Sequence, residues 1–285
     1  MTTSDAGLVV VDKPRGLTSH DVVARVRRLA GTRKVGHAGT LDPMATGVLV
    51  LGINRATRLL GHLMLTEKAY DATIRLGVAT STDDAEGEVI ATVPAGHLDE
   101  ATIRAAAAEF VGELLQVPTA VSAIKVDGKR AYQRVRDGEA VELKARPVTV
   151  HELRVTEVRG EELDVSVRCS SGTYVRAIAR DLGARLGVGG HLTALRRTAV
   201  GPYGLDAAHT LEELAEDFAT MPVAEAARAA FASLDLDEAQ ATDVRFGRAL
   251  RLDLPGLTAV FAPGGEFLAL YEPRGDVAKA VAVFV

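Results

Sequence analysis

Apolar residues in this chain of 285 residues follow two different periods, and the segments of the two kinds do not alternate regularly. Strand-like runs are "GLVVVDKP", "TGVLVLGI" and "KAYDATIRLG", and "RPVTVHELRVTEV" pairs with "EELDVSVRC" across Gly160. Helical spacing is found over residues 17–31, 54–64, 99–115 and 173–187. A parallel sheet needs a crossover, usually a helix, between successive strands. The order seen here therefore predicts an α+β fold with a largely antiparallel sheet.

The segment "LTSHDVVARVRRLAG" carries signals for both ends of a helix. Thr18 and Ser19 are suitable caps, and Asp21 stands in the capping-box position. Valines and a leucine then recur at helical spacing, and Gly31 is a typical residue after a helix end. We expect an amphipathic helix here with its arginines facing solvent.

A change of pattern near residue 228, inside "MPVAEAARAAFASL", predicts a domain boundary. Residues 1–228 would form the main domain. In residues 229–285, short apolar runs are separated by the turn sequences "PGL", "PGGE" and "EPRGD". This second segment is expected to be a small β-rich module.

Charge is distributed unevenly along the chain, although the net charge is only −5. Residues 1–60 hold nine Lys and Arg against four Asp, and residues 146–200 hold nine against six acidic residues. Residues 201–285 hold six against fourteen. Two basic segments could form one basic face, which is the local requirement for binding a nucleic acid. The alternative is an ordinary solvated surface.

Other features exclude several classes of protein. The longest apolar runs are far shorter than the ~20 residues of a membrane helix, and "MTTSDAG" does not resemble a signal peptide. We therefore expect a cytoplasmic protein without a membrane partner. A single cysteine, Cys169, excludes an internal disulfide. The acidic residues in the 83–88 stretch lie in one polar loop with no ligand-like partner elsewhere, so no metal site is expected.

The octamer "GHAGTLDP" places Asp42 between a leucine and a proline. Aspartate before proline is a common turn residue whose side chain bonds nearby backbone groups. A carboxylate on a rigid turn beside the core strand "GVLVL" could equally serve as a nucleophile or general base. The octamer alone leaves both interpretations open.

Six motifs occur in order: "GLVVVDKPRGLTSHDVV", "GHAGTLDPMATGVLVLG", "KAYDATIRLG", "SAIKVDGKRAY", "SSGTYVRAIARDLG" and "HLTALRRTAVGPY". Together they resemble the TruB-type tRNA pseudouridine synthases over roughly residues 7–205. The resemblance implies a pseudouridine-synthase fold, in which helices flank a central, largely antiparallel mixed sheet. It also implies a small C-terminal module similar to a PUA domain.

The reaction implied by the resemblance isomerises uridine 55 in the T-loop of tRNA. The base is everted, its glycosidic bond is cleaved, and C5 is attached to the ribose, with no cofactor. Asp42 matches the family's nucleophile, and Arg176 matches the arginine paired with it. Tyr70 matches the tyrosine that stacks on the target base, and its hydroxyl is a candidate for the proton transfer at C5. From the residues alone, Arg176 could be a surface residue and Tyr70 a core residue.

Further matches imply contacts with the substrate. His37 corresponds to the histidine that fills the space left by the everted base, and Lys13 to a lysine near the floor of the site. Leu195 corresponds to a leucine that lines the uracil pocket, while Gly39 and Thr40 are expected to shape the loop. Each of these residues could also be purely structural.

A basic stretch is expected to hold the RNA backbone. The insertion at about residues 119–147 fits the part of the family that binds the T-arm, as a hairpin around Asp127 and Gly128 followed by a short basic helix. The phosphate-binding candidates are Arg33, Lys34, Lys125, Lys129, Arg130 and Arg134. The alternative for each is a solvated surface residue.

Two other functions fit the same motifs. The chain could be the catalytic subunit of a guide-RNA pseudouridylation complex, or a tRNA-folding chaperone whose catalysis is incidental. It lacks basic tails and has its own candidate T-arm segment, so we expect a monomeric enzyme that needs no guide RNA. The module of residues 229–285 is short and acidic, and we expect it mainly to cover the catalytic domain rather than to bind RNA.

Overall fold

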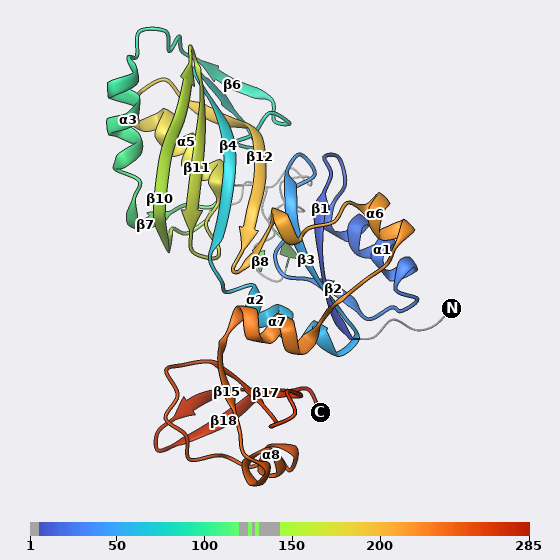
Figure 1. Cartoon of the computed structure of the whole chain (residues 1–285). Helices are drawn as coiled ribbons and strands as arrows, with labels where there is room; N and C mark the ends of the chain where they lie inside the picture. The colour runs from blue at the N-terminus through green and yellow to red at the C-terminus, as the bar shows by residue number, and fades with distance from the viewer. Residues whose placement is uncertain (1–5, 120–124, 127–128, 131–142) are drawn as a thin grey trace. The chain divides into compact units, whose positions relative to one another are not determined.

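The computed structural model describes residues 6–119, 125–126, 129–130 and 143–285 (Figure 1). The chain forms two compact units. Unit 1 comprises Met1–Pro43, Gly47–Met64 and Val200–Val285, and unit 2 comprises Met44–Thr46 and Leu65–Ala199. The predicted domain boundary near residue 228 remains a prediction, because the boundaries between these two units lie at other residues.

Unit 1 contains the N-terminal strands and the whole C-terminal region. Its elements are β1 (Gly7–Lys13), α1 (Ser19–Leu29), β2 (Val35–His37), β3 (Thr46–Ile53), the 3₁₀ helix η1 (Asn54–Leu59), α2 (Leu60–Leu63), β13 (Tyr203–Gly204), the 3₁₀ helix η2 (Leu205–Ala207), α6 (Leu211–Glu216), β14 (Met221–Pro222), α7 (Val223–Ala230), β15 (Ala232–Asp235), α8 (Glu238–Arg245), β16 (Thr258–Phe261), β17 (Phe267–Arg274) and β18 (Val277–Val283). Strand β1 pairs antiparallel with β14 and β3, and β2 pairs antiparallel with β3.

Unit 2 contains the longest strands. Its elements are β4 (Lys68–Leu76), β5 (Val78–Thr80), β6 (Val89–Thr92), α3 (Glu100–Ala108), β7 (Gly112–Gln116), β8 (Lys125–Val126), β9 (Lys129–Arg130), β10 (Arg146–Arg159), β11 (Glu162–Cys169), α5 (Val175–Arg185) and β12 (Gly190–Val200). The strand order is β12-β4-β11-β10-β7, and the pairs from β4 to β7 are antiparallel. Helices α3 and α5 pack against this sheet (Figure 1). The predicted α+β class with a largely antiparallel sheet is confirmed.

The predicted helix at residues 17–31 is confirmed as α1, including its cap. Thr18 accepts a hydrogen bond from the backbone of Asp21 at 3.1 Å, and the carboxylate of Asp21 accepts one from the backbone of Thr18 at 2.8 Å. Val22, Val23 and Val26 form the buried face. Gly31 follows the helix with a left-handed φ of 64°, a conformation that suits glycine.

Two sequence predictions need correction. The helix expected over residues 99–115 ends at Ala108, and β7 begins at Gly112. Gly112 has a φ of 113°, which a helix does not accommodate, and the following residues pair with β10 from Gln116 opposite Arg146 to Gly112 opposite Val150. The helix expected over residues 54–64 is instead η1 followed by the single turn α2.

The C-terminal residues form a four-stranded sheet of order β15-β16-β17-β18, in which only β15 and β16 are parallel. This confirms the expected small β-rich module. Its Phe261, Phe267 and Phe284 belong to the same buried cluster as Leu59 and Leu63. A second buried cluster, which includes Leu236, Val244 and Tyr271, is formed by residues of the module itself. Because the first cluster is shared, residues 229–285 belong to unit 1.

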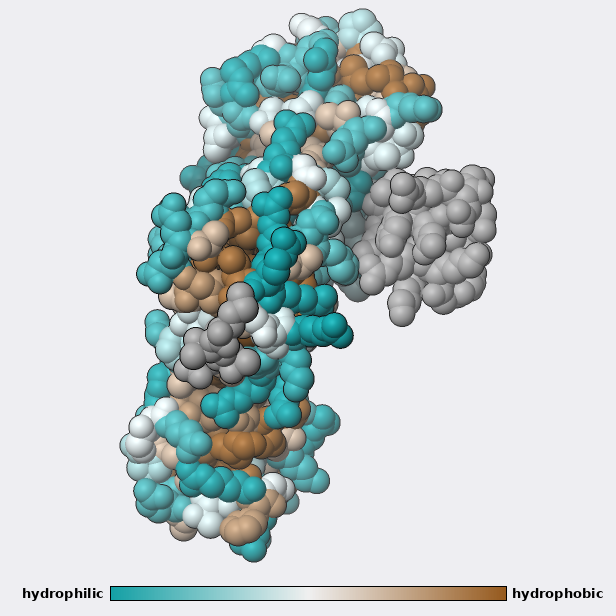
Figure 2. Space-filling view, turned by 90° about the vertical axis from the view of Figure 1, so that its right-hand side faces the viewer, coloured by the Kyte–Doolittle hydropathy of each residue, from teal (hydrophilic) through white to brown (hydrophobic). Residues whose placement is uncertain are grey.

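The molecular surface is mainly hydrophilic on the face drawn in Figure 2, where hydrophobic residues come to the surface in separate groups. The large apolar side chains with the greatest exposure are those of Leu65, Ile90, Leu115 and Phe246. Among the described residues, no helix has the length and apolar character needed to cross a membrane.

Candidate active site

The loop that carries Asp42 is fixed on the N-terminal side of this residue. Strand β2 ends at His37, and the backbone N–H of Ala38 still donates to Val50 in β3 at 2.9 Å. The buried hydroxyl of Ser19, at the start of α1, then accepts a hydrogen bond from the N–H of Leu41 at 2.8 Å and donates one to its carbonyl at 3.1 Å. One side chain thus holds both backbone groups of the residue before Asp42.

The residue after Asp42 is fixed as well. The carbonyl of Pro43 accepts a hydrogen bond from the N–H of Gly16 at 2.8 Å and lies 3.4 Å from Nζ of Lys13. Lys13 is fully buried, and its ammonium also donates to the carbonyls of Pro14 at 2.9 Å and Leu17 at 2.7 Å. A buried charge is stable only with such partners. Asp42 itself is partly exposed, so a rigid backbone presents its carboxylate.

The other predicted residues of this loop differ in exposure. His37 is partly buried, and its ring lies edge-on to that of His20 with a centroid distance of 5.8 Å. Gly39 has a φ of 109°, which explains the glycine at the bend before Asp42. Thr40 is exposed. Within unit 1, the structure thus brings Lys13, His37, Gly39, Thr40 and Asp42 together around one loop.

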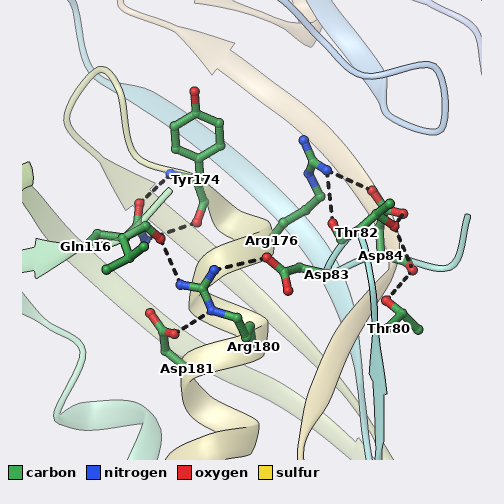
Figure 3. Close-up of polar contacts among 10 residues, drawn as sticks. Thr80, Thr82, Asp83, Asp84, Gln116, Tyr174, Arg176, Arg180 and Asp181 are labelled. Atoms are coloured by element: carbon green, nitrogen blue, oxygen red, sulfur yellow. Dashed lines mark hydrogen bonds and ion pairs between the residues drawn. The ribbon is translucent and has the colours of Figure 1, made fainter. Parts of the chain in front are cut away.

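Arg176 lies in unit 2, in the first turn of α5, and is buried rather than a surface residue (Figure 3). Its Nη1 donates to Oδ2 of Asp84 at 3.1 Å and to the carbonyl of Thr82 at 3.0 Å. Oδ1 of Asp84 accepts hydrogen bonds from the hydroxyl of Thr82 and, at 3.0 Å, from the N–H of Glu86. These described contacts of the Asp84 carboxylate hold the loop and the arginine.

A second arginine, one turn later, repeats the arrangement (Figure 3). Arg180 donates to Oδ2 of Asp83 at 3.1 Å, to Oδ1 of Asp181 at 2.8 Å and to the carbonyl of Val117 at 2.8 Å. Burial raises the pKa of Asp83, and the charges of Arg180 and Arg176 oppose this shift. Asp83 also has a left-handed φ of 60°. The loop from Thr82 to Asp84 is therefore bound to α5 at two successive turns.

Tyr70 and Leu195 lie on neighbouring strands of unit 2, β4 and β12, and both are nearly buried. On β4 the alternating pattern places Lys68 on the same buried face as Tyr70. Lys68 donates to the carbonyl of Thr66 at 2.7 Å, and burial, followed by the charge of Arg197, lowers its pKa to about 8. Arg197 is itself only 1% exposed. Along the sequence, buried Lys68 therefore lies two residues before Tyr70, and buried Arg197 lies two residues after Leu195.

Comparison with known families identifies the chain. The model described as "TruB family pseudouridylate synthase (N terminal domain)" matches residues 27–175. Two C-terminal models, for tRNA pseudouridylate synthase B and tRNA pseudouridine synthase II, match residues 176–235 and 231–285. The chain belongs to the TruB family of pseudouridylate synthases.

Two curated proteins are similar to this chain over nearly its full length. The protein named tRNA pseudouridine synthase B of Streptomyces griseus is 60% identical over 296 residues, covering 99% of this chain and 98% of its own. The protein of the same name from Thermobifida fusca is 59% identical and covers 98% of both chains.

Two solved structures share the TruB-type fold. A chain described as "Crystal Structure of a Cbf5-Nop10-Gar1 Complex" has a TM-score of 0.77 at 26% identity, covering 98% of this chain and 85% of that one. A chain from "Structure of H/ACA RNP bound to a substrate RNA containing 2'-deoxyuridine" has a TM-score of 0.75 at 24% identity with the same coverage. The predicted resemblance and fold are thereby confirmed.

The roles of several candidate site residues remain predictions. Asp42 belongs to unit 1 and Arg176 to unit 2, so the pairing implied by the resemblance remains a prediction. Arg33 and Lys34 are exposed, as phosphate contacts require. Lys125, Lys129 and Arg130 lie on the antiparallel pair β8 and β9, as the predicted hairpin requires. The turn of that hairpin, the predicted basic helix and Arg134 lie outside the described residues.

Sequence reasoning did not single out three buried charged residues that lie close in the fold or the chain to predicted site residues: Lys68, Asp84 and Arg197. The alternation in "KAYDATIRLG" could have placed Lys68 beside Tyr70, because residues two apart on a strand share a face. For Asp84, the sequence suggests nothing beyond a weak candidate metal ligand in a polar loop. Within the described part of the chain, no group of three or more His, Cys, Asp or Glu could hold a metal ion.

Proposed function

We propose that this TruB-family protein converts uridine 55 in the T-loop of tRNA into pseudouridine, with Asp42 as its nucleophile. The relatives that are about 60% identical are named tRNA pseudouridine synthase B, which supports tRNA as the substrate. The observation that carries the choice of Asp42 is its backbone support: Ser19 holds Leu41, while Gly16 and Lys13 hold Pro43. A nucleophile placed with this little freedom loses little entropy on reaching the reactive geometry.

The proposed reaction rearranges bonds within one nucleotide. The N1–C1′ bond of uridine breaks, a C5–C1′ bond forms, and the proton on C5 is transferred to N1 or to solvent. Nothing is oxidised or reduced, so the chemistry requires no cofactor. In this proposal the carboxylate of Asp42 attacks the ribose or the base, and Arg176 stabilises its charged form.

Tyr70 and Leu195 are proposed to hold the uracil ring while it is detached. Their burial on adjacent strands supports a water-poor pocket, in which a detached base is retained. The hydroxyl of Tyr70 is the proposed group for proton transfer at C5. Whether stacking or proton transfer dominates is tested by Tyr70→Phe, which keeps the ring and removes only the hydroxyl.

The target base must leave the folded T-loop, at a cost of a few kcal/mol of stacking. We assign His37 to the space that the base vacates, and its ring, braced by His20 at 5.8 Å, supports this role. Arg33, Lys34 and the basic residues of β8 and β9 are proposed to hold phosphates. Binding should then weaken steeply with salt, each neutralised phosphate adding a slope of about one.

The protein is proposed to act as a monomer in the cytoplasm without a guide RNA. The structures of the Cbf5 and H/ACA complexes favour the guided alternative only through a shared fold at 24–26% identity. The bacterial relatives named tRNA pseudouridine synthase B are far more similar to this chain. A stand-alone enzyme is therefore the better-supported proposal.

The deciding experiment uses a tRNA transcript labelled with tritium at C5 of its uridines, with no cofactor and no guide RNA. The wild type should release about one equivalent per tRNA, and Asp42→Asn should release none while binding tRNA within a few-fold of the wild type. A transcript with cytidine at position 55 is the control for the site. Tight binding without release by either protein would favour the guided-complex or chaperone alternative, and release by Asp42→Asn would refute the proposed nucleophile.

A further inference from the structure

The start of α5 is held by a reciprocal pair of hydrogen bonds from the end of β7 (Figure 3). Gln116 is the last residue of β7, and its side chain is almost completely buried. Its Oε1 accepts a hydrogen bond from the N–H of Tyr174 at 2.8 Å, and its Nε2 donates to the carbonyl of Tyr174 at 3.1 Å. The side-chain amide of Gln116 thus bonds to both the N–H and the carbonyl of Tyr174, as a paired residue of a neighbouring strand would.

Tyr174 is the N-cap of α5, and its own side chain makes no cap hydrogen bond. Its carbonyl also accepts the N–H of Ile178 at 3.2 Å, which is the first hydrogen bond of the helix. Gln116 therefore fixes the carbonyl from which the first turn is built. Arg176 is the second residue of that turn, so its backbone position depends on this anchor.

Two further contacts connect the same region with α5. Arg180 donates to the carbonyl of Val117, directly after Gln116, at 2.8 Å. Arg146, which is opposite Gln116 in the β7–β10 ladder, lies over the ring of Tyr174 at 5.7 Å from its centroid. Residues at the end of β7 and at the beginning of β10 thus both contact the N-cap or the first two turns of α5.

We propose that Gln116 is a positioning residue for Arg176, acting through the backbone of Tyr174. The inference rests on the proposed function, because it presumes that Arg176 takes part in catalysis. Gln116 needs no contact with the substrate for this role. Displacing a catalytic group by about 1 Å can reduce a rate by two orders of magnitude. Without Gln116, the partly buried N–H of Tyr174 would have to find another partner.

The kinetic test uses Gln116→Leu, which keeps most of the volume and removes both hydrogen bonds. In the tritium-release assay, kcat should fall by about tenfold while KM stays within about twofold. The matched control is Thr73→Val, which removes one side-chain hydrogen bond to Asp164 on the same sheet, at 2.7 Å, without touching α5. Its kcat should not change.

Epistasis separates positioning from a general loss of stability. In an Arg176→Ala background, Gln116→Leu should change kcat by less than about twofold, because the group it positions is already absent. Independent effects that multiply in the double variant would overturn the proposal. A tenfold rise in KM with kcat unchanged would also overturn it.

Amide hydrogen exchange tests the anchor without any activity. In Gln116→Leu, exchange at the amides of Tyr174 and Ile178, which donate to Gln116 and to the carbonyl of Tyr174, should be at least tenfold faster than in the wild type, with exchange in β10 and β11 unaltered. Unchanged exchange at these residues refutes the anchor. If the wild type releases no tritium but the exchange result is as expected, the proposed function fails while the anchoring of α5 stands.

Discussion

Asp84 and Arg176 form an ion pair whose side chains are only 4% and 5% exposed, with Oδ2 and Nη1 3.1 Å apart. Removing one member of such a pair leaves a buried charge without its partner, which typically costs 3–5 kcal/mol. We predict that Asp84→Ala lowers the free energy of unfolding by about this amount and also impairs turnover. Urea unfolding and tritium release measure the two effects.

Asp181→Ala is the control for this prediction. Asp181 also pairs with an arginine of α5, at 2.8 Å, but its side chain is 37% exposed. Exposed pairs contribute only about 0–1 kcal/mol. Equal losses of stability in the two variants would show that burial of the Asp84 pair has no energetic importance.

Ser19 offers a test of the support for Asp42. Ser19→Ala removes both hydrogen bonds to Leu41, and leaving these backbone groups unsatisfied should cost about 1–3 kcal/mol. Because Leu41 directly precedes Asp42, we expect kcat to fall by about tenfold or more, with tRNA affinity unchanged. Single-turnover rates and filter binding separate the two quantities.

The neighbouring Thr18→Ala is a suitable control for Ser19→Ala. It removes the N-cap bond of α1 and should lower stability by about 0.5–2 kcal/mol. Among its described contacts, the side chain of Thr18 bonds only to Asp21, so turnover should not change. Loss of turnover in Thr18→Ala equal to that in Ser19→Ala would mean that helix stability, rather than the clamp on Leu41, supports activity.

Local signals predicted much of the fold. The capping box of α1 and the strands β1, β3 and β4 follow from short-range patterns that the structure confirms. Strand β7 does not, because "GELLQ" becomes a strand through its ladder with β10, about 30 residues away. Propensity within a short window carries no information about such a distant partner.

The same limit applies to the candidate site. Arg176 was identified by its motif, but its partner Asp84 is 92 residues away in a segment that resembles an ordinary polar loop. The burial of Lys13 likewise depends on three carbonyls that only the folded chain brings to its ammonium. Motifs therefore identified residues of the site, whereas the interactions that hold them required the structure.

Lys68 should make the stability of the protein depend on pH. Its pKa is about 8 in the folded protein, against an ordinary value of 10.5. Below pH 8 both states are protonated, and the folded state bears the full cost of the buried charge, about 3 kcal/mol. Between pH 8 and 10.5 the unfolded state binds more protons at this amine than the folded state does, so its contribution to stability rises with pH.

Lys68→Met isolates this contribution. The variant should be more stable than the wild type at pH 7, and its advantage should shrink by about 3 kcal/mol as the pH rises from 8 to 10.5. Lys68→Arg stays charged throughout this range. The difference in free energy of unfolding between Lys68→Arg and Lys68→Met should therefore not shrink comparably as the pH rises. Urea unfolding at several pH values measures these differences, and a constant difference between wild type and Lys68→Met would contradict the lowered pKa.

The final prediction concerns the shared core of unit 1. Phe284 is buried, and its ring centroid lies 4.6 Å from that of Phe267. The carbonyl of Phe284 accepts a hydrogen bond from Arg55 at 2.9 Å, which connects the end of the chain to η1. Phe284→Ala should therefore lower the free energy of unfolding by about 3–5 kcal/mol and should unfold the N-terminal strands together with the C-terminal sheet.

Phe246→Ala is the matched control, because Phe246 lies in the same module but is 72% exposed. Its effect should stay within about 0.5 kcal/mol. Urea unfolding followed by circular dichroism gives both values, and hydrogen exchange in β1 and β18 reports whether they open together. Because the aromatic residues of the module pack against Leu59 and Leu63, residues 229–285 alone should not fold. A stable, cooperatively unfolding fragment 229–285 would instead establish an independent domain beyond residue 228.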